Sequence, residues 1–232
     1  MRKNILITGK PKSGKSTLLR KLIGPIPYKT GFVTDEIRGE HGRLGFEIVT
    51  SIGAKSVLAH VDFAMPIKVS KYSVNIENLK AILPAVIDFL PQDILYIDEI
   101  GQMQLYSTEF KNLVSKFFDA PNTCLATLSY VYNDEFTDLL RDRNDIILID
   151  LVPDNRDKQE EFVTQLLKKI EKAKGYISQP ERFDIQGSKV TLKSEHGVRE
   201  LTFKGGKWAC SCDFFATYGI CSHAIATEEI AR

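Results

Sequence analysis

The first 150 residues alternate short apolar runs with segments of helical periodicity. Four of the apolar runs have the length and composition of buried strands: NILIT (4–8), ILYID (94–98), CLATLS (124–129) and IILID (146–150). Two further runs, 29–37 and 43–50, are separated by the glycine-containing segment RGEHG and predict a β-hairpin. Strands that alternate with helices predict an α/β fold with a mostly parallel sheet covered by helices on both faces.

Apolar residues recur at helical spacing in three segments. Residues 76–90 predict one helix, which Pro84 should kink or displace, and residues 107–118 predict another. Residues 157–173 predict a third, with acids in its first half and lysines toward its end, an order that suits the helix dipole. Gly175 stands where a C-cap glycine is expected, so we predict that this helix ends there.

The pattern changes after residue 174. The segments FDIQGSKVTLKS and RELTFKGGKW resemble short strands joined by glycine turns, and a cysteine cluster follows them. We therefore predict two domains, residues 1–174 and a small β-rich module at residues 175–232. A domain as small as the second often needs a metal or a disulfide for stability.

The composition is that of an ordinary globular protein and excludes a disordered chain, since 43% of residues are hydrophobic and 26% are charged. The 31 Lys and Arg balance 30 Asp and Glu, so the net charge of +1 gives the whole chain no strong attraction to a polyanion. No uncharged stretch reaches the roughly 18 residues of a membrane span, and the first apolar run is too short for a signal peptide. These features favour a cytoplasmic protein.

A phosphate-binding motif follows the first predicted strand. GKPKSGKST fits the pattern G-x-x-x-x-G-K-[ST] and stands between a strand and a helix, as that motif requires. Glycines let the backbone N–H groups converge on a phosphate, and the helix directs its positive end at the same anion. Lys15 would bring a full charge to the β- and γ-phosphates, and the Ser16 hydroxyl would hold Mg²⁺. The predicted nucleotide-binding residues here are Gly9, Lys10, Pro11, Lys12, Ser13, Gly14, Lys15, Ser16 and Thr17.

Two adjacent acids end the strand at 94–98. Asp98 suits a role in holding Mg²⁺ beside Ser16, and Glu99 suits the activation of a water molecule. Kinases of similar fold need no water-activating acid, because their acceptor must be protected from water. The pair therefore favours a hydrolase over a phosphotransferase.

Several segments together resemble one family of P-loop proteins. The stretches GKPKSGKST, GFVTDEIRGEHGRLGFEIVT, KYSVNIENL, LYIDEIGQMQL and NRD (155–157) are similar to the small nucleoside-triphosphatases described from thermophiles and as the human cancer-related NTPase. This resemblance implies an ASCE-type, RecA-like P-loop fold and Mg²⁺-dependent hydrolysis of ATP, GTP and related nucleotides with loose base selectivity. It assigns phosphate binding to residues 9–17, Mg²⁺ to Asp98 and the water to Glu99. Gln102 and Gln104 depart from it, because the family usually has Lys and Glu there.

Other charged residues are candidates for contacts with the nucleotide. The resemblance suggests that Arg38 and Arg43 lie near it, although solvated hairpin charges are an equal alternative. A γ-phosphate that gains charge favours a cationic clamp, for which Arg141, Arg143 and Arg156 are candidates. Arg156 at a predicted helix start is the one we include among the nucleotide-binding residues.

The last 25 residues hold three of the four cysteines. Cys210, Cys212, Cys221 and His223 supply the three thiolates and one imidazole of a closed tetrahedral site, which predicts a structural Zn²⁺. Cys124, alone in an apolar run, reads as a small buried hydrophobe. The segment KWACSCDFFATYGICSHAIA resembles the SWIM zinc finger at all four ligand positions. That resemblance implies contact with nucleic acid or with protein.

The charge of the tail does not choose between these partners. Residues 174–232 hold eight Lys or Arg and seven Asp or Glu, although five cations could still gather on one face of a small sheet: Lys189, Lys193, Arg199, Lys204 and Lys207. We therefore predict an Mg²⁺-dependent nucleoside-triphosphatase with a zinc module that contacts nucleic acid or protein. A P-loop kinase, and a binding factor that uses ATP as a switch, are the alternatives.

Overall fold

The computed structural model describes residues 1–231 and divides into two compact units. One unit is Lys3–Glu160, and the other comprises Met1–Arg2 and the residues from Glu161 onward. The predicted division into domains at residue 174 stays a prediction, because compactness alone does not show which segments fold independently.

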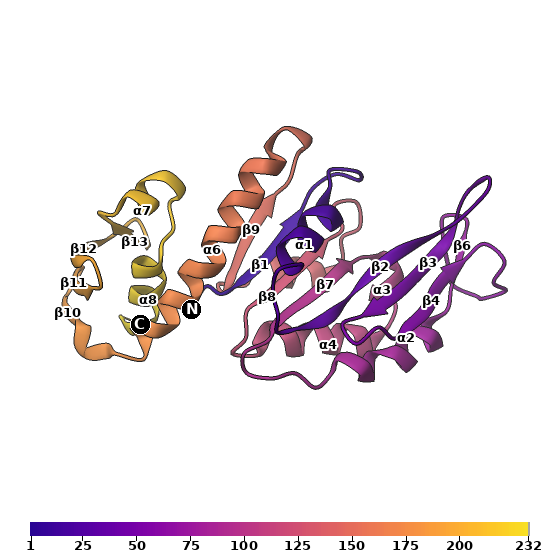
Figure 1. Ribbon diagram of the computed structural model, residues 1–232, viewed down its shortest axis with the longest axis horizontal. Coiled ribbons are helices and arrows are strands. Elements are labelled where there is room, and N and C mark those ends of the chain that lie inside the picture. Colours follow the sequence, from indigo (N-terminus) through magenta and orange to yellow (C-terminus); the bar gives the residue numbers. More distant parts are fainter. Residues whose placement is uncertain (232) are drawn as a thin grey trace. The chain divides into compact units, whose positions relative to one another are not determined.

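The larger unit is built on a nine-stranded sheet (Figure 1). Its strands are β1 (Asn4–Thr8), β2 (Lys29–Gly39), β3 (Gly42–Thr50), β4 (Lys55–His60), β5 (Lys68–Val69), β6 (Tyr72–Val74), β7 (Ile94–Ile100), β8 (Cys124–Leu128) and β9 (Ile146–Asp150). They lie in the order β5-β6-β4-β3-β2-β7-β8-β1-β9. Strands β2, β7, β8, β1 and β9 are parallel neighbours, and β3 to β6 extend the sheet through antiparallel pairs. The predicted α/β fold and the predicted hairpin of β2 and β3 are confirmed.

The order of the parallel strands matters for function. Strand β8 lies between β1, which leads into the phosphate loop, and β7, which carries Asp98 and Glu99. This is the added central strand that the family resemblance implies. Because the carboxyl ends of parallel strands meet at one edge, the ends of β1, β7 and β8 converge there.

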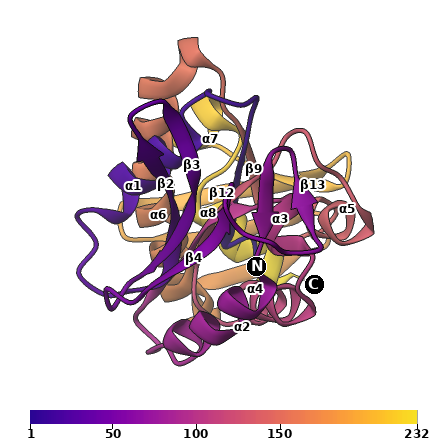
Figure 2. The ribbon, with the colours of Figure 1, turned by 90° about the vertical axis from the view of Figure 1, so that its right-hand side faces the viewer.

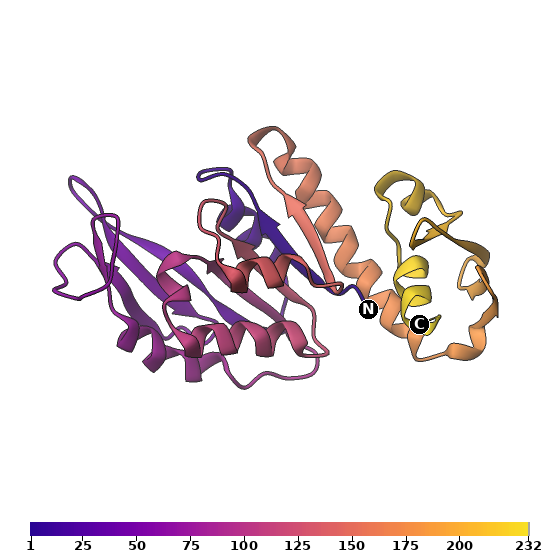
Figure 3. The same ribbon diagram turned by 180° about the vertical axis from the view of Figure 1, so that it is seen from behind.

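Helices cover both faces of this sheet. They are α1 (Lys15–Ile23), α2 (Ile76–Ile82), α3 (Gln102–Leu105), α4 (Thr108–Asp119) and α5 (Glu135–Arg141). Figure 2 shows α1 on one side of β2 and β3, with α2 and α4 on the other, and Figure 3 turns the face that carries α4 toward the viewer. On that face Phe110 and Phe117 of α4 are fully buried, and each contributes about 1.5–3 kcal/mol by leaving water.

The helix predicted at 76–90 is shorter than its apolar spacing indicated. The α-helix ends at Ile82, and Leu83–Val86 form a 3-10 turn that contains Pro84. Proline lacks the N–H that an α-helix would use, so the helix stops before it. Ile87 and Leu90, which the pattern placed on the buried face, are 41% and 55% exposed.

The last helix before the tail is longer than predicted. Helix α6 spans Arg156–Ile177 and passes through Gly175, so this glycine is not its C-cap. Tyr176, one residue further, is 3% exposed. Burial of Tyr176 offsets the roughly 1 kcal/mol that a glycine costs inside a helix, and the helix continues to Ile177.

The second unit contains a small antiparallel sheet in the order β10-β11-β12-β13. Its elements after α6 are β10 (Phe183–Gln186), β11 (Lys189–Ser194), β12 (Gly197–Lys204), β13 (Lys207–Cys210), α7 (Asp213–Tyr218) and α8 (Ser222–Ile230). Val190, Leu192, Leu201 and Trp208 are buried on one face of the sheet. The predicted β-rich C-terminal module is therefore present.

Candidate functional site

The phosphate loop connects the end of β1 to the start of α1. Its backbone has positive φ angles at Gly9 (150°), Lys12 (67°) and Gly14 (99°), a region that side chains disfavour. At Gly9 a Cβ atom would lie 2.2 Å from the carbonyl oxygen of Leu151, so only glycine fits. Alternation of such angles turns successive N–H groups to one side and makes a concave anion-binding surface. The loop thus has the backbone form that a bound phosphate requires.

Two elements bring polar side chains to Asp98. Lys15 and Ser16 begin α1, and Thr127 lies near the end of β8. The Ser16 hydroxyl donates to Oδ1 of Asp98 at 2.9 Å, and the Thr127 hydroxyl donates to the same oxygen at 2.6 Å. The buried Lys15 ammonium donates to the carbonyl oxygen of Gly9 at 2.9 Å. Asp98 is therefore fixed from two sides, while Lys15 lies against the start of the loop.

The other predicted loop residues differ in exposure. Ser13 is 2% exposed, and its hydroxyl has no hydrogen-bond partner within residues 1–231. The remaining predicted loop contacts have exposed side chains: Lys10, Pro11, Lys12 and Thr17. Lys10, Lys12 and Thr17 have backbone N–H groups that can donate to an anion, whereas Pro11 has none, and the side chains of all four face solvent.

The two acids carry perturbed carboxyl groups. Burial raises the pKa of Asp98 above its ordinary value, against hydrogen bonds from Thr127 and Ser16 and the charges of Arg20 and Lys15. Burial also raises the pKa of Glu99, where the Lys15 charge opposes the shift and the Asp98 charge adds to it. The register between β7 and β8 is irregular from Ile97 to Ile100, and such irregularities redirect side chains.

The residues present fit a divalent cation. Both hydroxyl hydrogen bonds fall on Oδ1 of Asp98, whereas Oδ2 is buried and has no partner within the described chain. A buried carboxylate oxygen without a partner is costly, and a cation or its bound water would satisfy it. Hydroxyl and carboxylate oxygens are the donors that Mg²⁺ prefers. Ser16 and Asp98 would hold it.

Two linked hydrogen bonds that the sequence did not reveal support the backbone of Asp98. The Thr34 hydroxyl of β2 donates to the Asp98 carbonyl oxygen at 2.6 Å, and the Gln104 amide donates to that hydroxyl at 3.3 Å. Gln104 is 5% exposed. Gln104, one of the two departures from the family resemblance, thus acts here as a neutral donor. Its only sequence signal was the departure from the family pattern.

The arginines that the sequence offered as nucleotide contacts do not all lie at the phosphate loop. Arg156 donates to carbonyl oxygens of the phosphate loop, within hydrogen-bond distance of Ser13 and Lys12. Arg143 precedes β9, at the edge opposite the loop, and pairs with Asp119 and Asp145. It is therefore not part of this site.

The remaining cations pair locally. Arg38 and Arg43 both pair with Glu36, and Arg43 also donates to the Tyr72 hydroxyl. Arg141 pairs with Asp138 one turn earlier in α5. None of these contacts joins the three arginines to the phosphate loop.

The cysteine cluster comes together in the second unit. The ligand atoms of Cys210, Cys212, Cys221 and His223 all lie within 4.8 Å of one another. The His223 Nδ1 atom is 3.6 Å from Sγ of Cys210 and 3.9 Å from Sγ of Cys221. A tetrahedral zinc with ordinary bond lengths would give about 3.6 Å between sulfur and nitrogen. The four residues therefore fit one tetrahedral ion.

Neighbouring groups support this cluster. Cys221 caps α8, and its sulfur accepts a hydrogen bond from the Ala224 N–H at 3.3 Å. The Tyr176 ring packs against the His223 ring with centroids 5.6 Å apart. Such surroundings orient metal ligands and stabilise thiolates. Cys124, in contrast, is fully buried on β8, and burial raises its pKa, so it is the buried hydrophobe that the sequence indicated.

The fold and the loop define a P-loop protein of the type with an added central strand. The family described as NTPase matches residues 4–164. The nucleoside-triphosphatase THEP1 of Thermotoga maritima is 36% identical over 166 residues, which are 71% of this chain and 95% of the relative. THEP1 of Natranaerobius thermophilus is 38% identical over 175 residues, 72% of this chain and 96% of the relative.

Two solved structures are similar to the same part of the chain. The crystal structure of THEP1 from the hyperthermophile Aquifex aeolicus has a TM-score of 0.64 and 31% identity, with 71% of this chain and 99% of that one covered. The solution structure of a human cancer-related nucleoside triphosphatase has a TM-score of 0.61 and 26% identity, with 72% and 97% covered. The chain belongs to the NTPase family and is a nucleoside-triphosphatase, a hydrolase.

Residues after the matched region have no counterpart in these relatives, whose own length is almost fully covered. The small sheet and the cysteine cluster are therefore additions to what these relatives contain. None of the helices among residues 1–231 has both the length and the apolarity that crossing a membrane requires.

Proposed function

We propose that this chain hydrolyses nucleoside triphosphates to diphosphate and phosphate with Mg²⁺, through the phosphate loop, Asp98 and Glu99. The observation that carries this proposal is the Asp98 carboxylate. One oxygen accepts from Ser16 and Thr127, while the other is buried and has no partner among residues 1–231. That arrangement suits a cation that bridges protein and phosphates.

The loop, its lysine and the two acids would each have a separate role in hydrolysis. Backbone N–H groups of the loop, which all residues of 9–17 except Pro11 carry, would bind the β-phosphate. Lys15 would leave the Gly9 carbonyl to pair with the β- and γ-phosphates. Magnesium, when bound by Ser16 and Asp98, neutralises charge on the same phosphates. The oxygen of a water molecule attacks the γ-phosphorus, the bond to the β–γ bridging oxygen breaks, and Glu99 accepts the proton of the water.

Phosphate release without an acceptor tests this proposal directly. We expect turnover of ATP, GTP, CTP and UTP with Mg²⁺, with rates within about tenfold of one another, and none with EDTA. A Lys15→Ala chain should bind nucleotide weakly and not turn over, because its loop has lost a full charge on the phosphates. Lys21→Ala is the matched control, since Lys21 lies on the same helix and pairs with Glu160. Formation of nucleoside diphosphate that requires an acceptor, with the phosphoryl group on that acceptor and no free phosphate, would instead indicate a kinase.

We propose that Cys210, Cys212, Cys221 and His223 hold one structural Zn²⁺. Four protein ligands leave no open position for a reacting water, so the ion would stabilise the module rather than take part in hydrolysis. Elemental analysis of purified, untagged protein should find one zinc per chain. An ordered tail with much less than one zinc would contradict this.

The outer face of the small sheet favours nucleic acid as the partner of this module. Lys189 pairs in register with Thr202, and Lys204 pairs with Lys207, so these cations and Lys193 share the solvent face. Arg199 pairs with the fully buried Leu192 and lies on the opposite face, so four of the five cations that could gather on one face do so. Asp184 and Glu200 lie on the outer face with the four lysines.

Binding to fluorescent single- and double-stranded oligonucleotides tests this partner. We expect weak binding, lost between 50 and 200 mM salt, that decreases when Lys189 and Lys193 are replaced by glutamate. Stimulated turnover on addition of oligonucleotide would favour the alternative in which ATP acts as a switch. No binding at low salt would instead favour contact with a protein as the function of the module.

A further inference from the structure

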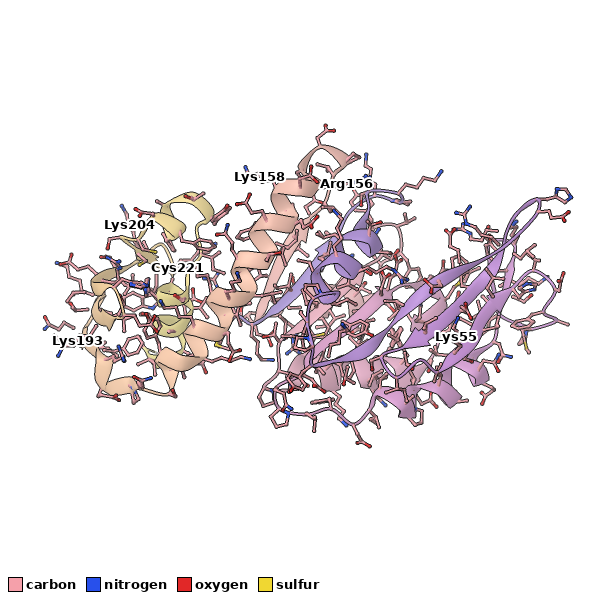
Figure 4. The ribbon with its side chains drawn as sticks, in the orientation of Figure 1. Lys55, Arg156, Lys158, Lys193, Lys204 and Cys221 are labelled. Carbon is pink, nitrogen blue, oxygen red and sulfur yellow. The ribbon has the colours of Figure 1, made fainter. Side chains whose placement is uncertain are left out.

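Arg156 contacts the outer side of the phosphate loop through two hydrogen bonds. Its Nε donates to the Ser13 carbonyl oxygen at 2.5 Å, and its Nη2 donates to the Lys12 carbonyl oxygen at 2.9 Å. A Cβ atom at Gly14 would lie 2.9 Å from the same Nε. In Figure 4 Arg156 lies beside the loop at the start of α6. Two nitrogens of the guanidinium plane are thus engaged with loop backbone.

The geometry follows from how such a loop distributes its backbone groups. When N–H groups turn inward to an anion, the neighbouring carbonyl groups turn outward and need donors of their own. The planar guanidinium offers two donors at a fixed spacing, which a lysine ammonium does not. Lys12 has a φ of 67°, so the peptide whose carbonyl Arg156 contacts follows a residue in a disfavoured conformation.

A rigid turn sets the position of Arg156. Pro153–Asn155 form a 3-10 turn directly before α6. The Asn155 side chain accepts from the Val152 N–H at 3.0 Å and donates to the Asp150 carbonyl oxygen at 3.0 Å. Asp150 ends β9, the strand next to β1. The arginine is therefore anchored to the sheet beside the strand from which the loop emerges.

We propose that Arg156 is a positioning residue that holds the loop in its phosphate-binding form. It does so through its two hydrogen bonds to the Ser13 and Lys12 carbonyl oxygens, which together we call the clasp. It is not, on this view, a clamp on the γ-phosphate. The inference rests on the proposed function only in that the loop binds the β-phosphate. Because diphosphates and triphosphates share that contact, loss of the clasp should weaken both equally. A γ-phosphate clamp would act only on the triphosphate and its transition state.

The test compares Arg156→Ala and Arg156→Lys with Lys158→Ala, which removes an exposed cation two residues further along the same helix (Figure 4). We would measure the Kd of ADP and of a non-hydrolysable ATP analogue by calorimetry, and kcat and KM for ATP. In Arg156→Ala we expect both Kd values and KM to rise about tenfold, as the loss of two hydrogen bonds predicts, with kcat changed less than about threefold. Arg156→Lys keeps the charge without the fork and should recover only part of this loss. Lys158→Ala should change nothing.

Three outcomes would overturn the proposal. The first is a fall in kcat of about a hundredfold with unchanged ADP affinity, which would make Arg156 a γ-phosphate clamp. The second is unchanged ADP affinity in Arg156→Ala, and the third is full recovery in Arg156→Lys, which would assign the effect to charge. If Arg156→Ala does not fold, Arg156→Lys is compared with the wild-type chain instead: an equal loss of affinity for ADP and for the ATP analogue supports the proposal, and unchanged affinity for ADP overturns it. A wild-type chain that releases no phosphate would defeat the proposed function, whereas its ADP affinity would still test the clasp.

Discussion

Glu99 and Asp98 are neighbours whose surroundings differ. Asp98 is 1% exposed and accepts hydrogen bonds from Ser16 and Thr127, which favour its ionised form. Burial raises the pKa of both carboxyl groups, but no hydrogen bond to the Glu99 carboxylate is found among residues 1–231. The carboxylate without fixed donors has its oxygens free to accept a proton and is the better proton acceptor of the two.

Replacing Glu99 by Gln should therefore separate binding from hydrolysis. The glutamine keeps the shape of the side chain but cannot accept the proton, so we expect unchanged nucleotide affinity and turnover lowered by about 10²-fold or more. Single-turnover phosphate release and equilibrium binding measure the two quantities. Glu109→Gln is the matched control, because Glu109 is an exposed acid on α4 that pairs with Lys80 of α2. Undiminished turnover in Glu99→Gln would remove this residue from the mechanism.

At this scale the sequence allowed predictions for the residues with strong local signals and none for those without. Residues 9–17 and the acid pair follow from spacing within short segments. Thr34 and Gln104 reach Asp98 from different elements, so their contacts depend on strand order and register, which no local pattern records. The nucleotide contact predicted for Arg156 stays a prediction. Its hydrogen bonds to the loop carbonyls could not be predicted, because a sequence shows a charge without the acceptor that it meets.

At the scale of elements, two glycines in the second unit have opposite roles. Gly175 lies inside α6, where an added Cβ would meet nothing within 4 Å. Gly219 follows α7 with a φ of 67°, and an added Cβ there also meets nothing. Space is equal at both positions, so only the backbone conformation distinguishes them.

Alanine should therefore stabilise one site and destabilise the other. Gly175→Ala should raise the free energy of unfolding by about 0.5–1 kcal/mol, because alanine loses less backbone entropy in a helix. Gly219→Ala should lower it by about 1–2 kcal/mol, because the left-handed conformation crowds a Cβ atom. Scanning calorimetry of the two variants checks both signs. A stabilising Gly219→Ala would mean that the turn after α7 differs from the one described.

The four-ligand cluster should determine whether the small unit folds. Structural zinc contributes an apparent binding free energy of about 10–16 kcal/mol in small fingers, which is comparable to the stability of a whole domain. We expect Cys212→Ser to lower bound zinc well below one per chain and to remove amide protection after about residue 180. Ser211→Ala, an exposed neighbour, should retain both. Phosphate release should persist in Cys212→Ser, because the larger unit has its own core.

Helix ends show where element prediction failed. Pro84 ended α2 because a missing N–H is a local property that no packing can restore. Gly175 did not end α6, because a glycine only weakens a helix and the burial of Tyr176 beyond it decides the outcome. Strands β4 to β6 were not predicted, because they are short and their alternation of apolar and polar residues is weak.

At the scale of the molecule, the phosphate loop, both acids and Arg156 lie within Lys3–Glu160. The relatives are almost fully covered by 71–72% of this chain, so proteins without the tail have the same fold. A fragment of residues 1–175 should therefore fold and hydrolyse ATP at a rate within about tenfold of the full chain, a barrier change of about 1.4 kcal/mol. Steady-state phosphate release by both proteins measures this. A far larger loss would mean that the tail supplies a group to the active site.

Trp208 is the single tryptophan of the chain, and it lies in β13, two residues before Cys210. Its side chain is 7% exposed, with the Phe203 ring 5.3 Å away. Because the chain has one tryptophan, indole emission excited at about 295 nm comes from the small unit. The wavelength of that emission depends on how far the ring is shielded from water. Chelation of zinc should shift that emission to longer wavelength while phosphate release continues. The chain thus carries an intrinsic optical reporter for one of its two units, which needs no dye and no label.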